Sequence, residues 1–72
     1  MKNYPDQAAW YDTWVALVDF HRKIGGTSPP PNPIRLEAWP FESDKVKERH
    51  WEATVVWAQV NGIEELLLGS LD

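Results

Sequence analysis

A proline-rich segment near the middle of this chain separates two stretches that are each expected to contain a long helix. Residues 27–33 read Thr-Ser-Pro-Pro-Pro-Asn-Pro. Proline lacks the backbone N–H that a helix or a central strand needs, and consecutive prolines favour an extended polyproline II path. The segment is therefore predicted to be a connector, with regular structure on either side of it.

The first stretch predicts one long amphipathic helix over about residues 4–24. Asn3 is placed to cap this helix, and Pro5 is tolerated in its first turn. The glycine pair at 25–26 is a typical helix end. At 100° per residue the apolar side chains fall on one broad face. We expect this face to contain Trp10, Tyr11, Trp14, Leu17, Val18 and Ile24, with His21 near its middle.

The second stretch predicts a helix over about residues 44–61, followed by a short helix over 63–68. Ser43 marks the start, and Asn61-Gly62 is a strong C-terminal signal. Two apolar stripes lie on opposite sides of this helix. The larger stripe is expected to face the core and contains Val46, Ala53, Val56, Trp57 and Val60. The smaller stripe is expected to lie outside the core and contains Trp51, Val55 and Ala58.

These elements predict an all-α fold in a single small domain over residues 1–72, with an extended connector over 25–42. One brief strand is conceivable over Ile34–Glu37, and Trp39–Phe41 is expected to fold back on the helices as a hydrophobic latch. A connector of this length can return the full length of a helix, so it does not force the two helices to be antiparallel. We nevertheless expect the antiparallel arrangement.

The chain contains five tryptophans and no cysteine in 72 residues. A domain of this size buries only about 60% of its unfolded surface and is marginally stable without disulfides, a metal or self-association. Tryptophan carries a large hydrophobic area. Two helices share one seam, and the apolar surface is wider than one seam can cover. We therefore expect a homodimer with a four-helix core.

Charge and hydropathy narrow the classes of partner. The net charge is −4, from 11 acidic and 7 basic residues that form no basic cluster. Binding to phosphates needs a basic face, so nucleic acid is not the expected partner. No apolar run approaches the roughly 18 residues that cross a membrane, and no signal peptide is recognisable. We expect a cytoplasmic protein that binds itself and another protein.

An aromatic side chain outside the core is the strongest sequence signal of a partner-binding site, because tryptophan is enriched in binding hot spots. Trp51 fits this description if the larger stripe faces the core. An arginine beyond the prolines is placed to stack on an indole. The predicted partner-binding residues are Trp51, Val55, Trp39 and Arg35.

The two histidines, His21 and His50, lie on or near the apolar faces of different helices, so they could meet. They are candidates for a pH-sensitive or ligand contact, because histidine titrates near neutral pH. The acidic residues next to them in sequence point elsewhere, so no metal site and no cofactor are predicted. No nucleophile has a plausible base nearby, so we expect no catalytic residues and no enzyme.

The sequence thus favours a small acidic, non-enzymatic protein-interaction module that acts through aromatic helix surfaces. Inhibitors, antitoxins, immunity proteins and accessory subunits have this profile. One alternative is a nucleic-acid-binding accessory or regulatory protein. A second alternative is a small ligand- or metal-binding helical bundle that uses His21 and His50. The proline segment is either a ligand for an aromatic groove or only a connector.

Overall fold

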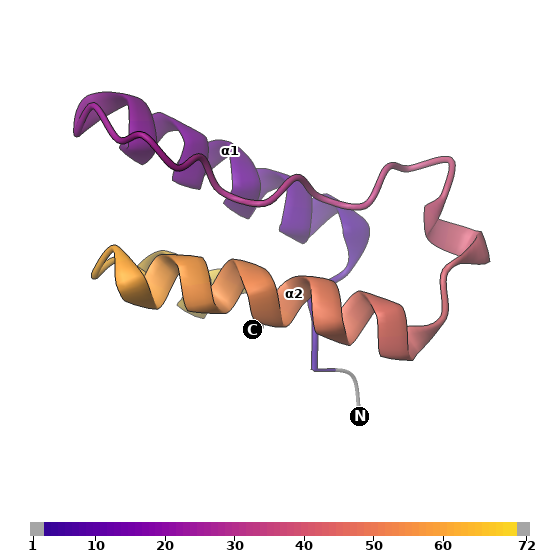
Figure 1. Cartoon of the computed structure of the whole chain (residues 1–72). Coiled ribbons are helices and arrows are strands. Elements are labelled where there is room, and N and C mark those ends of the chain that lie inside the picture. Colours follow the sequence, from indigo (N-terminus) through magenta and orange to yellow (C-terminus); the bar gives the residue numbers. More distant parts are fainter. Residues whose placement is uncertain (1–2, 71–72) are drawn as a thin grey trace.

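The computed structural model describes residues 3–70 and is all-helical over that range (Figure 1). Its elements are α1 (Gln7–Lys23), the 3₁₀ helix η1 (Trp39–Phe41), α2 (Asp44–Val60) and the 3₁₀ helix η2 (Glu64–Ser70). The predicted all-α class is confirmed. The conceivable strand over Ile34–Glu37 is wrong, because residues 3–70 contain no strand. None of the helices in this range combines the length and the apolar character that crossing a bilayer requires.

The start of α1 differs from the prediction by three residues. The side chain of Asp6, not that of Asn3, caps the helix by accepting a hydrogen bond from the Ala9 backbone N–H at 2.9 Å. Tyr4 lies before the cap and is buried, and its hydroxyl donates to Asp44 at the start of α2. The capping carboxylate and the anchored tyrosine together set the helix start at Gln7.

Both long helices end in the same glycine motif. Gly25 and Gly62 have φ values of 63° and 70°, a left-handed conformation that glycine adopts without steric cost. One residue further on, the backbone N–H of Ile63 donates to the Ala58 carbonyl at 2.9 Å. Ile63 is also buried, so it makes the closing contact expected for this motif. The predicted ends of both helices are confirmed to within one residue.

The two long helices run parallel, so the antiparallel expectation is wrong (Figure 1). Trp10 in the first turn of α1 packs against Trp51 in the first half of α2, with ring centroids 5.3 Å apart. At the other end, His21 packs against Trp57 with centroids 6.4 Å apart. Each helix has 17 residues and is therefore about 25 Å long. The connector returns along that whole length, as an extended chain can.

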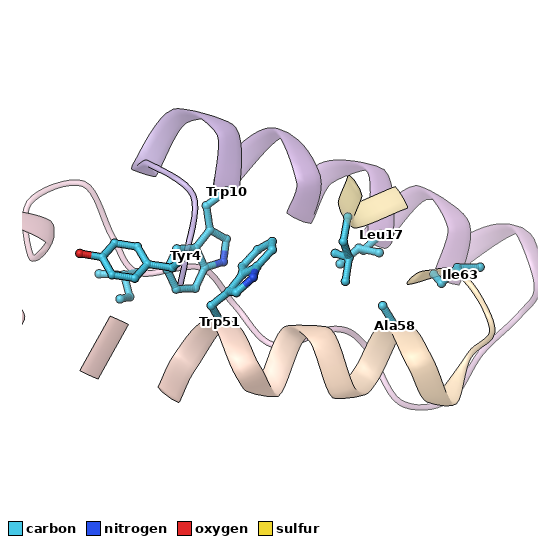
Figure 2. Packing of buried hydrophobic residues seen from close by; sticks show 8 residues of the cluster. Tyr4, Trp10, Leu17, Trp51, Ala58 and Ile63 are labelled. Atoms are coloured by element: carbon cyan, nitrogen blue, oxygen red, sulfur yellow. The ribbon is translucent and has the colours of Figure 1, made fainter. Parts of the chain in front are cut away.

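The core closes within one chain, because the connector and η2 complete what the two long helices leave open. Figure 2 shows Trp10 and Trp51 filling the space between the helices, with Leu17 and Ala58 further along. η2 packs against both α1 and α2. The buried hydrophobic residues are Tyr4, Trp10, Leu17, Ile34, Trp51, Ala58, Ile63 and Leu67. Burying these tryptophans therefore does not require a second chain.

The predicted faces of α2 are reversed in the structure. Trp51 is 2% exposed and faces the core, whereas Val60 is 80% exposed and Val56 49%. An indole buries far more area than a valine, and Trp51 has Trp10 opposite it. The area of one side chain thus outweighed the number of aliphatic residues on the other stripe.

The face of α1 is also shifted from the prediction. Tyr11 and Ile24 are about half exposed, and Thr13 is buried in their place. The hydroxyl of Thr13 donates to the Ala9 carbonyl at 3.0 Å, and Thr54 of α2 makes the equivalent bond to His50 at 3.4 Å. Because this local bond satisfies the hydroxyl, a threonine can be buried at low cost.

Candidate protein-interaction surfaces

Trp51, the first predicted partner-binding residue, belongs to the core. Its indole packs edge-to-face against Trp10 at an interplanar angle of 77°, and only 2% of the residue is exposed. Val55 is half-buried and packs against the same core. Trp51 therefore holds the fold together and offers almost no surface to a partner, whereas Val55 keeps part of its side chain exposed.

Trp39 completes an aromatic cluster around Trp10. Its ring lies 5.7 Å from that of Trp10 at 85°, and 5.9 Å from that of Tyr4 at 73°. Edge-to-face pairs of this kind add about 0.5–1.5 kcal/mol each beyond their buried area. Trp39 therefore acts as the predicted latch that ties the end of the connector to the helices. Phe41 takes no part in the latch, since it is 86% exposed.

A buried lysine that was not among the predicted site residues covers the face of Trp39. The Nζ atom of Lys47 lies 4.2 Å from the Trp39 ring centroid and 5.9 Å from that of Tyr4, and the residue is 8% exposed. A cation over an indole face is attracted by the ring quadrupole. The sequence feature that could have predicted this position is the four-residue spacing from Lys47 to Trp51, which places both residues on one face of α2.

The Tyr4–Asp44 contact fixes the start of the chain to the start of α2. The Tyr4 hydroxyl donates to Oδ1 of Asp44 at 2.5 Å. This hydrogen bond raises the pKa of Tyr4 to about 12, with further contributions from burial and from the negative charges of Asp44 and Glu48. A carboxylate acceptor stabilises the neutral phenol and opposes the phenolate. The contact is structural.

His21 and His50 do not meet. His50 is exposed beside the Trp10 ring, at 6.1 Å, whereas His21 packs against Trp57 at the other end of the helices. Trp10 and His21 are 11 residues apart on α1, or about 16 Å. Because His50 lies beside Trp10 and the two helices are parallel, His50 and His21 lie at opposite ends of the helix pair. Among residues 3–70 no group of three or more His, Cys, Asp or Glu side chains could hold a metal ion.

The first open apolar surface is a groove between α1 and the connector, which we call the aromatic groove. It encloses about 520 Å³. The rings of Tyr11 and Trp14 lie 5.6 Å apart along one side, and Leu36, 68% exposed, lies on the other. Arg35 is exposed and lines this groove. The lining residues are Gln7, Tyr11, Trp14, Asn32, Pro33, Ile34, Arg35, Leu36 and Glu37.

The second open apolar surface is the stripe of Val46, Ala53, Val56 and Val60 on α2, which we call the valine face. All four residues are exposed. Three of them, Ala53, Val56 and Val60, also line a hollow of about 560 Å³ between α2 and the start of the connector. At this hollow Trp57 Nε1 donates to the Ser28 carbonyl at 3.0 Å. The hydrogen bond holds the connector at the edge of the valine face.

Comparison of the chain with protein-family models, with curated proteins and with solved structures gives no match. Function is therefore inferred from the two open surfaces alone. Of the four predicted partner-binding residues, only Arg35 lies on one of them. Tyr11 and Trp14 were assigned to the core because a helical wheel does not show that the connector covers only part of α1.

Proposed function

We propose that this chain is a small acidic, non-enzymatic protein-interaction module of the cytoplasm, which binds another protein and a second copy of itself. The observation that carries the proposal is the pair of apolar surfaces outside a core that is already closed. Large exposed apolar patches are uncommon on monomeric proteins and mark interaction sites. Inhibitors, antitoxins, immunity proteins and accessory subunits work through surfaces of this kind.

The aromatic groove supports a protein as the other partner. Tyrosine, tryptophan and arginine are the residue types most enriched in binding hot spots, and Tyr11, Trp14 and Arg35 lie together here. The groove is concave and mainly apolar, and the Arg35 guanidinium can donate to carbonyl or carboxylate oxygens at its edge. An extended segment of a partner with an acidic or carbonyl group at that edge fits this chemistry.

The side chains of the aromatic groove also support a role without catalysis. Its charged residues are one arginine and one glutamate, Arg35 and Glu37, and its lining includes no serine, cysteine or histidine. A nucleophile activated by a neighbouring base is therefore missing from this surface. His21 and His50 lie at opposite ends of the bundle, which removes the geometry that a shared ligand site would need.

Affinity capture from the native cell tests this role. The bait is the tagged full chain, compared with the double variant Tyr11→Ala and Leu36→Ser. The control is Phe41→Ser, which removes an even more exposed apolar side chain outside both surfaces. Circular dichroism shows whether each bait is folded. We expect a protein captured by the wild type and the control and lost with the groove variant. Capture of the same proteins by all three baits, or of none, contradicts the proposal.

A further inference from the structure

The valine face has the spacing of a helix–helix seam. Val46, Ala53 and Val60 recur every seven residues, and Val56 lies three residues after Ala53. Alternating steps of three and four residues define the contact stripe of paired helices. The stripe lies on the side of α2 opposite Trp51 and Ala58, so nothing in the core uses it. From Val46 to Val60 the stripe covers 15 residues, a rise of about 21 Å along the helix.

We propose that the valine face is the contact between two copies of this chain, with their α2 helices antiparallel across a two-fold axis near Ala53. This inference rests on the proposed role as an interaction module and names one of its partners and the surface involved. A small residue at the axis lets the two helix backbones approach closely. Val46 and Val60 are equally far from Ala53, so Val46 packs against the partner's Val60.

The charge distribution favours the antiparallel direction. Lys45 and Arg49 are exposed in the first half of α2, and no basic residue follows position 49. The second half of α2, residues 53–60, contains no charged residue. An antiparallel pair places Lys45 and Arg49 of each α2 beside the uncharged second half of the other. A parallel pair would instead place Arg49 beside the partner's Arg49.

The same register gives Arg49, the one charged residue within the stripe, an aromatic neighbour. Arg49 and Trp57 are each four residues from Ala53, on either side, so the two-fold axis brings Arg49 beside the partner's Trp57. A guanidinium stacks favourably on an indole face. Trp57 is half-buried at the edge of the valine face and keeps part of its surface available for this contact.

The expected dimer is weak. One two-helix seam lies at the low end of specific interface sizes, where affinities are often about micromolar. Sedimentation equilibrium from about 10 µM to about 1 mM therefore covers the transition. The test variant is Val56→Ser with Val60→Ser, and the control is Phe41→Ser. We expect the test variant to raise the dissociation constant at least about tenfold and the control to leave it unchanged.

The absence of cysteine from the chain allows a clean test of direction. Val46→Cys and Val60→Cys are prepared separately and oxidised mildly, alone and as a mixture. An antiparallel seam joins the two variants in the mixture, and neither forms a disulfide dimer alone. Self-linking of each variant without linking in the mixture would overturn the direction.

Two results separate this inference from the proposed function. If the chain stays monomeric at the highest concentration while the aromatic groove still captures another protein, the proposed dimer is overturned. Binding to another protein then remains supported. A concentration-dependent dimer that dissociates in the valine-face variant, without any captured protein, supports the dimer and contradicts binding to another protein. Equal dimerisation of the wild type, the test variant and the control overturns the valine face as the contact.

Discussion

At the scale of single residues, the Tyr4–Asp44 hydrogen bond makes stability depend on pH in the alkaline range. The pKa of Tyr4 is raised to about 12 in the folded chain, against 10.0 for an ordinary tyrosine. The unfolded chain therefore loses this proton first, and the folded chain binds more protons between these values. The contribution is complete below pH about 10 and is lost as the pH rises toward about 12.

The measurement is urea unfolding of the wild type and of Tyr4→Phe between pH about 9 and about 12. The free energy of unfolding should fall more steeply with pH in the wild type, because phenylalanine has no proton to lose. Parallel pH dependence of the two proteins would show that the hydrogen bond does not hold the proton in solution.

Trp51 provides a second prediction at this scale. Trp51→Ala removes a side chain that is 2% exposed and is expected to lower the free energy of unfolding by about 3–5 kcal/mol. Val60→Ala on the same helix removes a side chain that is 80% exposed and should change it by less than about 0.5 kcal/mol. Chemical denaturation measures both values. Similar small losses of unfolding free energy for the two variants would show that Trp51 is not buried in the core.

At the scale of elements, three of the four ends of α1 and α2 were predictable from sequence. The start of α1 and the buried faces of the two helices were not. Ser43, Gly25 and Gly62 act through local backbone chemistry, so a reader of the sequence finds them. Which face of α2 is buried depends on Trp10, which belongs to another helix. A helical wheel counts the apolar residues on each face. It does not compare the area that Trp51 buries with the area that three valines would bury.

The direction of α2 escaped prediction for a related reason. The connector is long enough for either direction, so only tertiary contacts decide between them. Trp39 and its Lys47 partner hold the far end of the connector, and Trp57 holds the near end through Ser28. The candidate site is a similar case. Arg35 was named from the sequence, but the groove that it lines was not, because α1 and the connector form it together.

The close approach of Gly26 to His21, where α1 meets the connector, gives a prediction at the scale of elements. A Cβ atom at Gly26 would lie 2.6 Å from Cδ2 of the His21 ring, which packs against Trp57. Gly26→Ala should therefore destabilise the chain by about 1–3 kcal/mol through overpacking. In a His21→Ala background the same change should cost much less. Urea unfolding of the four proteins gives the coupling energy, and strict additivity would contradict the close approach.

At the scale of the whole molecule, the chain divides its apolar surface between two tasks. Tryptophans from α1, α2 and the connector build a core that needs no second copy. The aliphatic stripe of α2 and the aromatic groove stay outside that core. The central claim is that the two sides of α2 have opposite roles, one closing the fold and the other remaining open for a partner.

Thiol labelling of single-cysteine variants tests this claim most directly, since the chain has no cysteine of its own. Ala58→Cys reports on the core side of α2, and Val60→Cys reports on the valine face. At low protein concentration, Val60→Cys should react as fast as in the unfolded chain, and Ala58→Cys should be strongly protected. At high concentration the valine-face thiol should also become protected. Rapid labelling at position 58 with protection at position 60 in dilute protein would contradict the account.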